Sequence, residues 1–241
     1  QIDATIINTK SKFAIAKATN ITSASPLRTA APCPYFSKCG GCQLQHTTYQ
    51  NALAIKQQIV QDAISSIGKI NHKVLPCVPS QQTYEYRNKF AMPINPATKK
   101  LGMYRTGSHN IVDIDKCLLQ KPQINKLVEV FNSYLQTTTC SIFDDKTKKG
   151  VLKHLVARQV DNKLLITVVI NSDDLADKQN LVEILKNNFD NFGLSLNINT
   201  LCNNVILTDK FKNVYGPTHI EVCENDIKYQ INNQSFLQIN D

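Results

Sequence analysis

The 241-residue sequence predicts an α+β fold, made of the end of a small β-barrel, a cysteine-rich loop with a helix, and a central, mostly antiparallel sheet with helices. Three observations support this prediction. Residues 1–30 alternate weakly between apolar and polar side chains around a polar turn, as the strands of a hairpin do. Apolar residues recur at helical spacing between 48 and 67. From residue 74 onward, strand and helix patterns alternate along the chain.

Composition and charge indicate a globular protein of the cytoplasm with an anionic partner. Hydrophobic residues make up 42% of the chain, which is enough for an ordinary core. Lysine and arginine exceed aspartate and glutamate by 27 to 19, which favours nucleic acid as a partner, although a solvated basic surface has the same charge. Eight cysteines without an N-terminal signal peptide favour a reducing compartment. The longest apolar run, 164–170, is too short to cross a membrane.

The first 30 residues are expected to form the last hairpin of a barrel, followed by a linker. Ile2, Ile6 and Ile15 alternate with polar residues around the turn N-T-K-S-K, and the sequence S-A-S-P-L-R follows as the linker. Two strands alone are not stable, so the barrel would begin before residue 1. Because Gln1 is not an initiator residue, we expect the sequence to be a piece of a longer protein.

A helix is expected between residues 48 and 67. Thr47 and Gln50, three residues apart, form a capping box, and Leu53 and Val60 lie on the apolar face. The N-terminus of this helix would hold the preceding cysteine loop, where the helix dipole favours negative charge.

The central domain is expected to combine the sheet with two helices. Ile124, Leu127 and Phe131 have the spacing of a helix face. Two apolar stretches on either side of Asp161 and Asn162 indicate a β-hairpin. The predicted helices are 121–135 and 175–189, and the predicted strands are 84–94, 101–104, 111–114, 151–159, 163–170, 194–199, 203–208, 219–223 and 227–232.

The stretch 33–46, C-P-Y-F-S-K-C-G-G-C-Q-L-Q-H, carries three cysteines at the spacing C-x5-C-x2-C. Their thiolates are soft metal donors, and the two glycines between Cys39 and Cys42 let the backbone curl so that both sulfurs point the same way. Together with Cys33 they are one ligand short of a closed tetrahedral site or a cubane cluster. The sequence therefore predicts a metal site with a fourth ligand from elsewhere.

Five further cysteines could supply the fourth ligand. We favour Cys117, because it follows a strand in a setting of alternating charge where a small apolar side chain has no evident core to fill. Cys202 and Cys223 fall in strand patterns, which suits buried core residues better. Cys77 stays the main rival, and Cys140 is the fifth candidate.

Five motifs, in this order, give the chain a specific resemblance to a known family. They are the cysteine stretch at 33–46, Y-R-N-K at 86–89, G-M-Y-R-T-G-S-H at 102–109, I-V-D-I-D-K-C at 111–117 and S-F-L-Q-I-N at 235–240. Together they resemble the iron–sulfur RNA uracil-5-methyltransferases, especially the bacterial enzymes that form 5-methyluridine in 23S rRNA. The chain resembles only the N-terminal and central part of that family.

The resemblance implies a [4Fe-4S] cluster and S-adenosylmethionine as the methyl donor. The cluster ligands would be Cys33, Cys39, Cys42 and Cys117, and Gln238 matches the family glutamine that contacts S-adenosylmethionine. The nucleophilic cysteine and catalytic glutamate of the family match no residue here. We therefore expect no catalytic residue in this chain, no activity from the chain alone, and a monomer.

The resemblance also implies four segments. The family has an RNA-binding TRAM barrel of the oligonucleotide-binding type, a central α+β domain and a C-terminal Rossmann-like methyltransferase domain, which we expect to be absent. The segments are 1–30, the barrel tail and linker; 31–72, the iron–sulfur loop and helix; 73–232, the central domain; and 233–241, the start of the methyltransferase domain.

RNA contacts are expected on the matched motifs, since Arg and Lys neutralise phosphates and Asn can read a base edge. Without the resemblance, Y-R-N-K would be an ordinary polar strand face and the phenylalanine of S-F-L-Q a core residue. Leu237 and Gln234 depart from the family, which more often has S-F-F-Q and a preceding arginine. A basic run at 148–158 either extends the RNA surface or is a solvated face. The expected RNA-binding residues are Arg87, Asn88, Lys89, Arg105, His109 and Phe236.

Two other functions stay open. One is a zinc-stabilised RNA-binding module without enzymatic activity, in which His46 joins the three cysteines of the stretch as a ligand. The other is a redox or radical enzyme that uses the cluster for electron transfer. The spacing C-x5-C-x2-C differs from the C-x3-C-x2-C of radical enzymes, and a fourth cysteine would close the site. An iron assay separates the zinc module from both cluster proteins.

Overall fold

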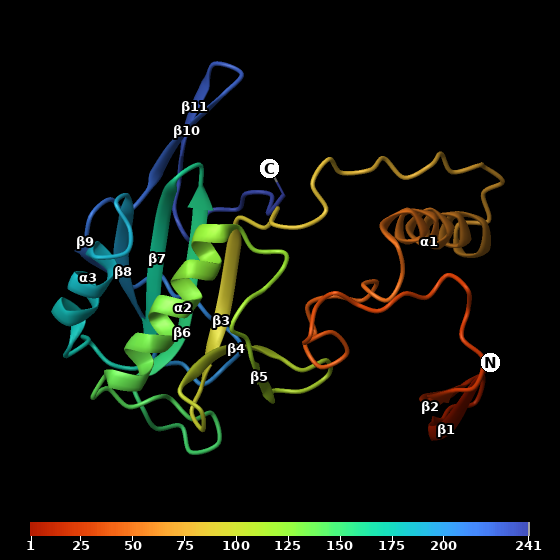
Figure 1. The fold of residues 1–241 in the computed structure, drawn as a ribbon, viewed down its shortest axis with the longest axis horizontal. Helices are drawn as coiled ribbons and strands as arrows, with labels where there is room; N and C mark the ends of the chain where they lie inside the picture. The colour runs from red at the N-terminus through yellow and green to blue at the C-terminus, as the bar shows by residue number, and fades with distance from the viewer. Residues whose placement is uncertain (241) are drawn as a thin grey trace. The chain divides into compact units, whose positions relative to one another are not determined.

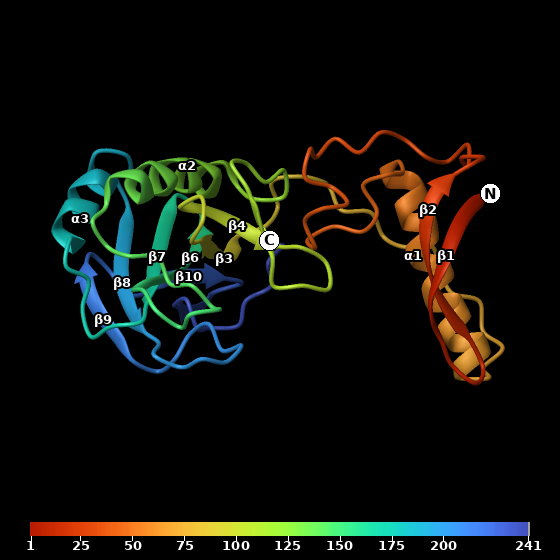
Figure 2. The same cartoon turned by 90° about the horizontal axis from the view of Figure 1, so that it is seen from below.

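The structure, a computed structural model, describes residues 1–240 and consists of two compact units (Figures 1 and 2). The first unit contains Gln1–Pro34 and Gln43–Pro79. The second contains Tyr35–Cys42 and the chain from Ser80 onward. The last residue of the predicted segment 233–241, Asp241, lies outside the described residues.

The first unit holds a hairpin and a helix. The predicted hairpin is present as the antiparallel strands β1 (Ile2–Thr9) and β2 (Ala14–Ile21), whose residues are all exposed. Helix α1 (Tyr49–Asp62) continues into the π-helical turn η1 (Ala63–Ile67).

The helix cap lies one residue later than expected. The hydroxyl of Thr48, at the N-cap, accepts a hydrogen bond of 3.3 Å from the backbone N–H of Asn51. The hydroxyl of Thr47 instead donates to the carbonyl oxygen of Leu27 at 2.9 Å, which ties the helix start to the linker. The predicted capping box is therefore wrong, because the expected cap residue is already engaged by a distant carbonyl.

A seven-stranded sheet in the order β5-β4-β3-β6-β7-β8-β9 forms the second unit. Most neighbours are antiparallel, and a separate hairpin, β10–β11, follows the sheet in the chain. The sheet strands are β3 (Lys89–Asn95), β4 (Lys100–Tyr104), β5 (Ile111–Asp113), β6 (Leu152–Val160), β7 (Lys163–Ile170), β8 (Phe192–Ile198) and β9 (Phe211–Tyr215), and the hairpin consists of β10 (Ile220–Glu224) and β11 (Ile227–Ile231).

The expected fold class needs correction, because the sheet is mixed: the pair β7–β8 is parallel, although the other neighbouring pairs are antiparallel as expected. Strands β7 and β8 run parallel and are joined through helix α3 (Lys178–Lys186), since a parallel pair needs a crossover connection. This β7–α3–β8 arrangement is the unit from which doubly wound, Rossmann-like sheets are built. The apolar run 164–170 fits it, because all its residues are buried, as expected for a strand with both faces covered.

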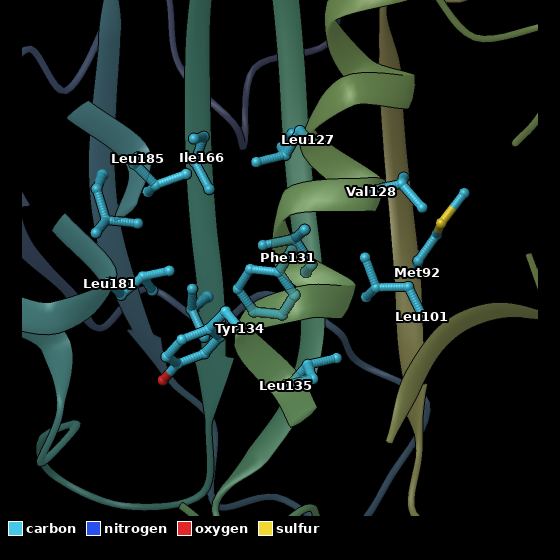
Figure 3. Packing of buried hydrophobic residues seen from close by; sticks show 14 of the residues in the cluster. Met92, Leu101, Leu127, Val128, Phe131, Tyr134, Leu135, Ile166, Leu181 and Leu185 are labelled. Carbon is cyan, nitrogen blue, oxygen red and sulfur yellow. The ribbon is translucent and has the colours of Figure 1, made fainter. Parts of the chain in front are cut away.

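Helix α2 (Pro122–Thr137) and helix α3 cover one face of the sheet (Figures 1 and 2). Figure 3 shows Leu127, Phe131 and Tyr134 of α2 pointing at the strands, and Leu181 and Leu185 of α3 beside Ile166. These side chains are almost completely buried. Burial of one such aliphatic or aromatic side chain contributes about 1.5–3 kcal/mol, so this layer supplies most of the stability of the unit.

The opposite face of the sheet carries polar side chains. Lys89 of β3 lies directly opposite Arg158 of β6, and Thr167 of β7 lies opposite Ser195 of β8 in the same alternation. The segment 232–240 lies against this face, because the amide of Asn233 donates to the hydroxyl of Thr167 at 2.8 Å.

The predicted strand 203–208 does not form. The side-chain amides of Asn197 and Asn199 donate to the carbonyl oxygens of Thr208 and Val205, at 2.8 and 2.7 Å, and hold this stretch as a loop. The edge position in the sheet is taken by β9 instead. No helix within residues 1–240 is long and apolar enough to cross a membrane.

Candidate functional site

The cysteine loop of the second unit is fastened to strand β4 and the turn that follows it. The backbone N–H of Gly40 donates to the carbonyl oxygen of Tyr104 at 3.0 Å, and Cys39 forms a β-bridge with Arg105. A Cβ atom on Gly40 would lie 3.1 Å from the same oxygen, so a glycine permits the close approach. Arg105 therefore lies next to the cysteine loop.

A second fastening joins the start of the loop to the strand before Cys117. The Tyr35 hydroxyl accepts a hydrogen bond from the backbone N–H of Asp115 at 3.2 Å and donates to its carboxylate at 3.3 Å. The side chain of Asn125 holds both backbone groups of Cys117, accepting from its N–H at 2.9 Å and donating to its carbonyl oxygen at 3.0 Å. The position of Cys117 is thus fixed by helix α2.

The predicted cluster ligands divide between the two units. Cys33 belongs to the first unit, whereas Cys39, Cys42 and Cys117 belong to the second. The sulfur of Cys39 accepts a hydrogen bond from the N–H of Gly41 at 3.4 Å. Among residues 1–240, no group of three or more Cys, His, Asp or Glu side chains is arranged to hold a metal ion. The fit of a cluster therefore rests on the chemistry of its donors, not on a preformed cage.

The Y-R-N-K motif does not form an exposed polar face. Asn88 is completely buried; its amide donates to the carbonyl oxygen of Gln238 at 2.8 Å, and its backbone N–H donates to that of Ile239 at 3.0 Å. The Asn88 side chain has no accessible surface in this arrangement, and the base contact expected from Asn88 stays a prediction. The side chain positions the segment that carries Gln238.

Lys89, which is half-buried, and Arg158, which is completely buried, form a pair of neighbouring cations. The ammonium group of Lys89 donates to the carbonyl oxygen of Asn233 at 2.6 Å, and Nη2 of Arg158 donates to that of Ser235 at 2.7 Å. Nε and Nη1 of Arg158 find no hydrogen-bond partner among residues 1–240. Burial lowers the pKa of both groups, and the Arg158 charge lowers that of Lys89 further.

Phe236 and Gln238 are both exposed on the segment that these groups hold, and Phe236 keeps 87% of its surface. An aromatic side chain presented in this way is available to stack on a base. The alternative of a core phenylalanine is excluded. Arg87 is half-buried, with its backbone bonded to Leu119 and Lys121.

A cavity of about 800 Å³ adjoins the end of β4. The hydroxyl of Tyr104 lies 3.5 Å from Nε2 of His154, and the Tyr104 ring meets the ring of His109 edge-on with centroids 5.7 Å apart. Burial, and then the Lys153 charge, lower the pKa of His154 to about 4, so this imidazole is neutral near pH 7.

Sequence reasoning placed His109 near a functional site but named His154 and Arg158 only as part of a basic run that could extend the RNA surface. Both lie in the basic run 148–158, which a solvated face explained equally well. The available signal was their position in L-K-H-L-V-A-R-Q-V, where charged residues interrupt an otherwise apolar strand.

The second cavity, of about 630 Å³, lies between β7, β8 and the segment 230–234.

The chain is similar in sequence to curated proteins named uncharacterized RNA methyltransferases. One from Halalkalibacterium halodurans is 32% identical over 246 residues, covering 100% of this chain and 54% of the relative. One from Staphylococcus epidermidis is 34% identical over 98% of this chain and 53% of the relative. One from Caldanaerobacter subterraneus is 37% identical over 86% and 47%. The chain thus spans about half the length of these relatives, and no family model matches it.

A solved structure shares the fold. The crystal structure of Pyrococcus abyssi tRNA (uracil-54, C5)-methyltransferase in complex with S-adenosyl-L-homocysteine matches with a TM-score of 0.71 and 23% identity, over 99% of this chain and 53% of that chain. Together with the mixed sheet, this match overturns the expected fold class, including the expected absence of a Rossmann-like domain. The same match gives no support to the expectation that this chain alone is inactive.

Proposed function

We propose that this chain is part of an S-adenosylmethionine-dependent RNA methyltransferase that forms 5-methyluridine. The observation that carries the proposal is the sequence similarity to RNA methyltransferases over the entire chain. The fold shared with a tRNA uracil methyltransferase, whose crystal contains S-adenosyl-L-homocysteine, supports the same chemistry. S-adenosylmethionine would supply the methyl group. The four predicted segments remain our proposal for how the chain is divided.

We propose 23S rRNA as the substrate, on the five motifs of the resemblance, whereas the structural relative acts on tRNA. Methyl transfer from radiolabelled S-adenosylmethionine to 23S rRNA and tRNA transcripts, measured with the purified protein that contains this chain, tests both parts. Label in 5-methyluridine of the 23S transcript is the expected result. Label in tRNA alone would replace the substrate but keep the reaction, and no label in either would refute the reaction.

The proposed role of this chain is to hold RNA. Arg87, Lys89 and Arg105 are proposed to neutralise phosphates, and His109 and Phe236 to contact bases. Gln238 is proposed to contact S-adenosylmethionine. Asn88 and Arg158 act indirectly: they bind the backbone of the segment that presents Phe236 and Gln238, and so position these two side chains. We place no catalytic residue in this chain.

We also propose a [4Fe-4S] cluster with Cys33, Cys39, Cys42 and Cys117 as ligands. The donor set supports it, since four thiolates suit iron–sulfur clusters and an N–H donor already faces the sulfur of Cys39. Iron, sulfide and zinc are to be measured on protein purified without oxygen, and about four irons and four sulfides are expected. One zinc and no iron would instead support the zinc-stabilised module.

Cysteine variants separate a cluster ligand from a cysteine that binds no metal. We expect Cys117→Ser to lose most of the iron and to lower the melting temperature. The control, Cys223→Ser, changes an exposed residue of β10 and is expected to alter neither. Equal iron contents and melting temperatures in the two variants would refute Cys117 as a ligand. We further propose that the protein is a cytoplasmic monomer, which size-exclusion chromatography checks for the oligomeric state.

A further inference from the structure

The cavity beside β4 is built from five segments of the chain, one of which is 93–97 from β3 and the turn after it. Tyr104 and His109 come from β4 and the turn after it, His154 comes from β6, and the loops 143–146 and 201–206 complete the wall. All of them belong to the second unit. The volume, about 800 Å³, is in the range of cavities that hold small organic ligands.

One atom in the wall lacks a partner. Nδ1 of His154 is buried and makes no hydrogen bond with any of residues 1–240, while Nε2 faces the Tyr104 hydroxyl at 3.5 Å. A buried polar atom without a partner is uncommon in proteins and indicates that something else bonds to it. Nδ1 has no accessible surface, so a ligand in the cavity reaches it only if the imidazole ring turns.

The charges of the lining select a neutral ligand. Asp144 and Asp145 balance Lys146 and Lys153, and the Lys153 ammonium is already held by the carbonyl oxygens of Asn199 and Leu201, at 3.1 and 2.8 Å. An isolated phosphate would find no surplus of positive charge here. A neutral, planar group with hydrogen-bonding edges matches the lining better.

The aromatic side chains give the cavity a stacking surface. Tyr104 keeps 39% of its surface exposed, and His109 meets its edge. The amides of Asn110 and Asn204 also line the cavity and can both donate to and accept from a base edge.

We propose that this cavity receives one unstacked base of single-stranded RNA, which stacks on Tyr104 and turns its polar edge to the side-chain amides of Asn110 and Asn204. This base is additional to the uridine that is methylated, because the site contains no group that transfers a methyl. The inference rests on the proposed RNA-binding function and gives it a specific pocket.

The test compares two tyrosines of equal exposure. Tyr84 keeps 41% of its surface exposed, as against 39% for Tyr104, but it does not line the cavity. Binding is measured by fluorescence anisotropy with a fluorescein-labelled single-stranded RNA nonamer of mixed sequence and with a nonamer that lacks bases. Tyr104→Leu is expected to weaken binding of the base-containing RNA about 5- to 100-fold, the range for loss of one base–aromatic stack.

The other variants make the outcome decisive. Tyr84→Leu should bind both nonamers like the unchanged protein, and Tyr104→Phe, which keeps the ring, should retain most of the affinity. Binding of the base-free nonamer should not respond to Tyr104→Leu. If the unchanged protein binds RNA and Tyr104→Leu binds it equally well, the base pocket is refuted while RNA binding stands. If the unchanged protein binds neither nonamer at low salt, the RNA-binding function falls and the pocket with it.

Discussion

Replacing Arg158 with methionine should leave the protein at least as stable as it is now. The guanidinium is completely buried, donates one hydrogen bond to Ser235, and leaves Nε and Nη1 without partners among residues 1–240. Loss of the one charge-assisted bond costs about 1.5–3 kcal/mol. Each buried N–H without a partner already costs about 1–3 kcal/mol, and methionine removes both. Repulsion of the Lys89 ammonium disappears as well.

We therefore expect the free energy of unfolding of Arg158→Met to be unchanged or to rise by roughly 1–2 kcal/mol, as for other buried charges replaced by apolar residues. Urea denaturation measures it, with an unchanged slope as the sign of an intact two-state transition. Leu155→Ala, at a neighbouring buried position of β6, is the control and should lose about 2–5 kcal/mol.

The same Arg158→Met variant should bind single-stranded RNA more weakly, because Ser235 loses the contact that fixes the segment bearing Phe236. Stability and binding would then change in opposite directions, as expected where a strained arrangement serves function. A loss of more than about 2 kcal/mol would show that the guanidinium is well compensated, and the reasoning from its unpartnered groups would be wrong.

Three further outcomes follow from the same contacts. His154 has a pKa of about 4 in the folded protein, against 6.5 in the unfolded chain. Its contribution to the free energy of unfolding, about 3 kcal/mol, is therefore complete above pH 6.5 and is lost as pH falls towards 4. His154→Gln should flatten that part of the profile of stability against pH. Asp177 accepts hydrogen bonds from Tyr134, Thr138 and Cys140, so Asp177→Asn should lose about 2–4 kcal/mol in thermal unfolding; an unchanged melting temperature would contradict this. RNA affinity should fall at least tenfold between about 50 and 200 mM salt, whereas a flat titration would exclude phosphate contacts.

Local patterns were enough to predict much of the second unit. The spacing of Ile124, Leu127 and Phe131 predicts helix α2, and the turn at Asp161 predicts the β6–β7 hairpin, because both depend on residues near in sequence. The parallel pairing of β7 with β8 was missed. The pattern strand, helix, strand was visible, but the partner of a buried strand depends on tertiary packing.

Most of the candidate site could not be predicted, because it depends on burial. Lys89 and Arg158 look like surface charges in the sequence, and only the strand register brings them together under the C-terminal segment. The cavity has the same origin, since Tyr104 and His154 are fifty positions apart. Asn88 is the opposite case. Its motif suggested that it recognises a base, but in the structure its side-chain amide donates to the carbonyl oxygen of Gln238.

The way in which the segment 232–240 is held has an evolutionary consequence. Asn88, Lys89 and Arg158 all bind its carbonyl oxygens, which every amino acid possesses. The path of the segment is therefore independent of the side chains at exposed positions such as Phe236. Substitutions there can alter which ligand is recognised while the backbone stays in place. The polar face of the sheet thus holds the backbone of this segment in place, while changes to its exposed side chains can change its specificity.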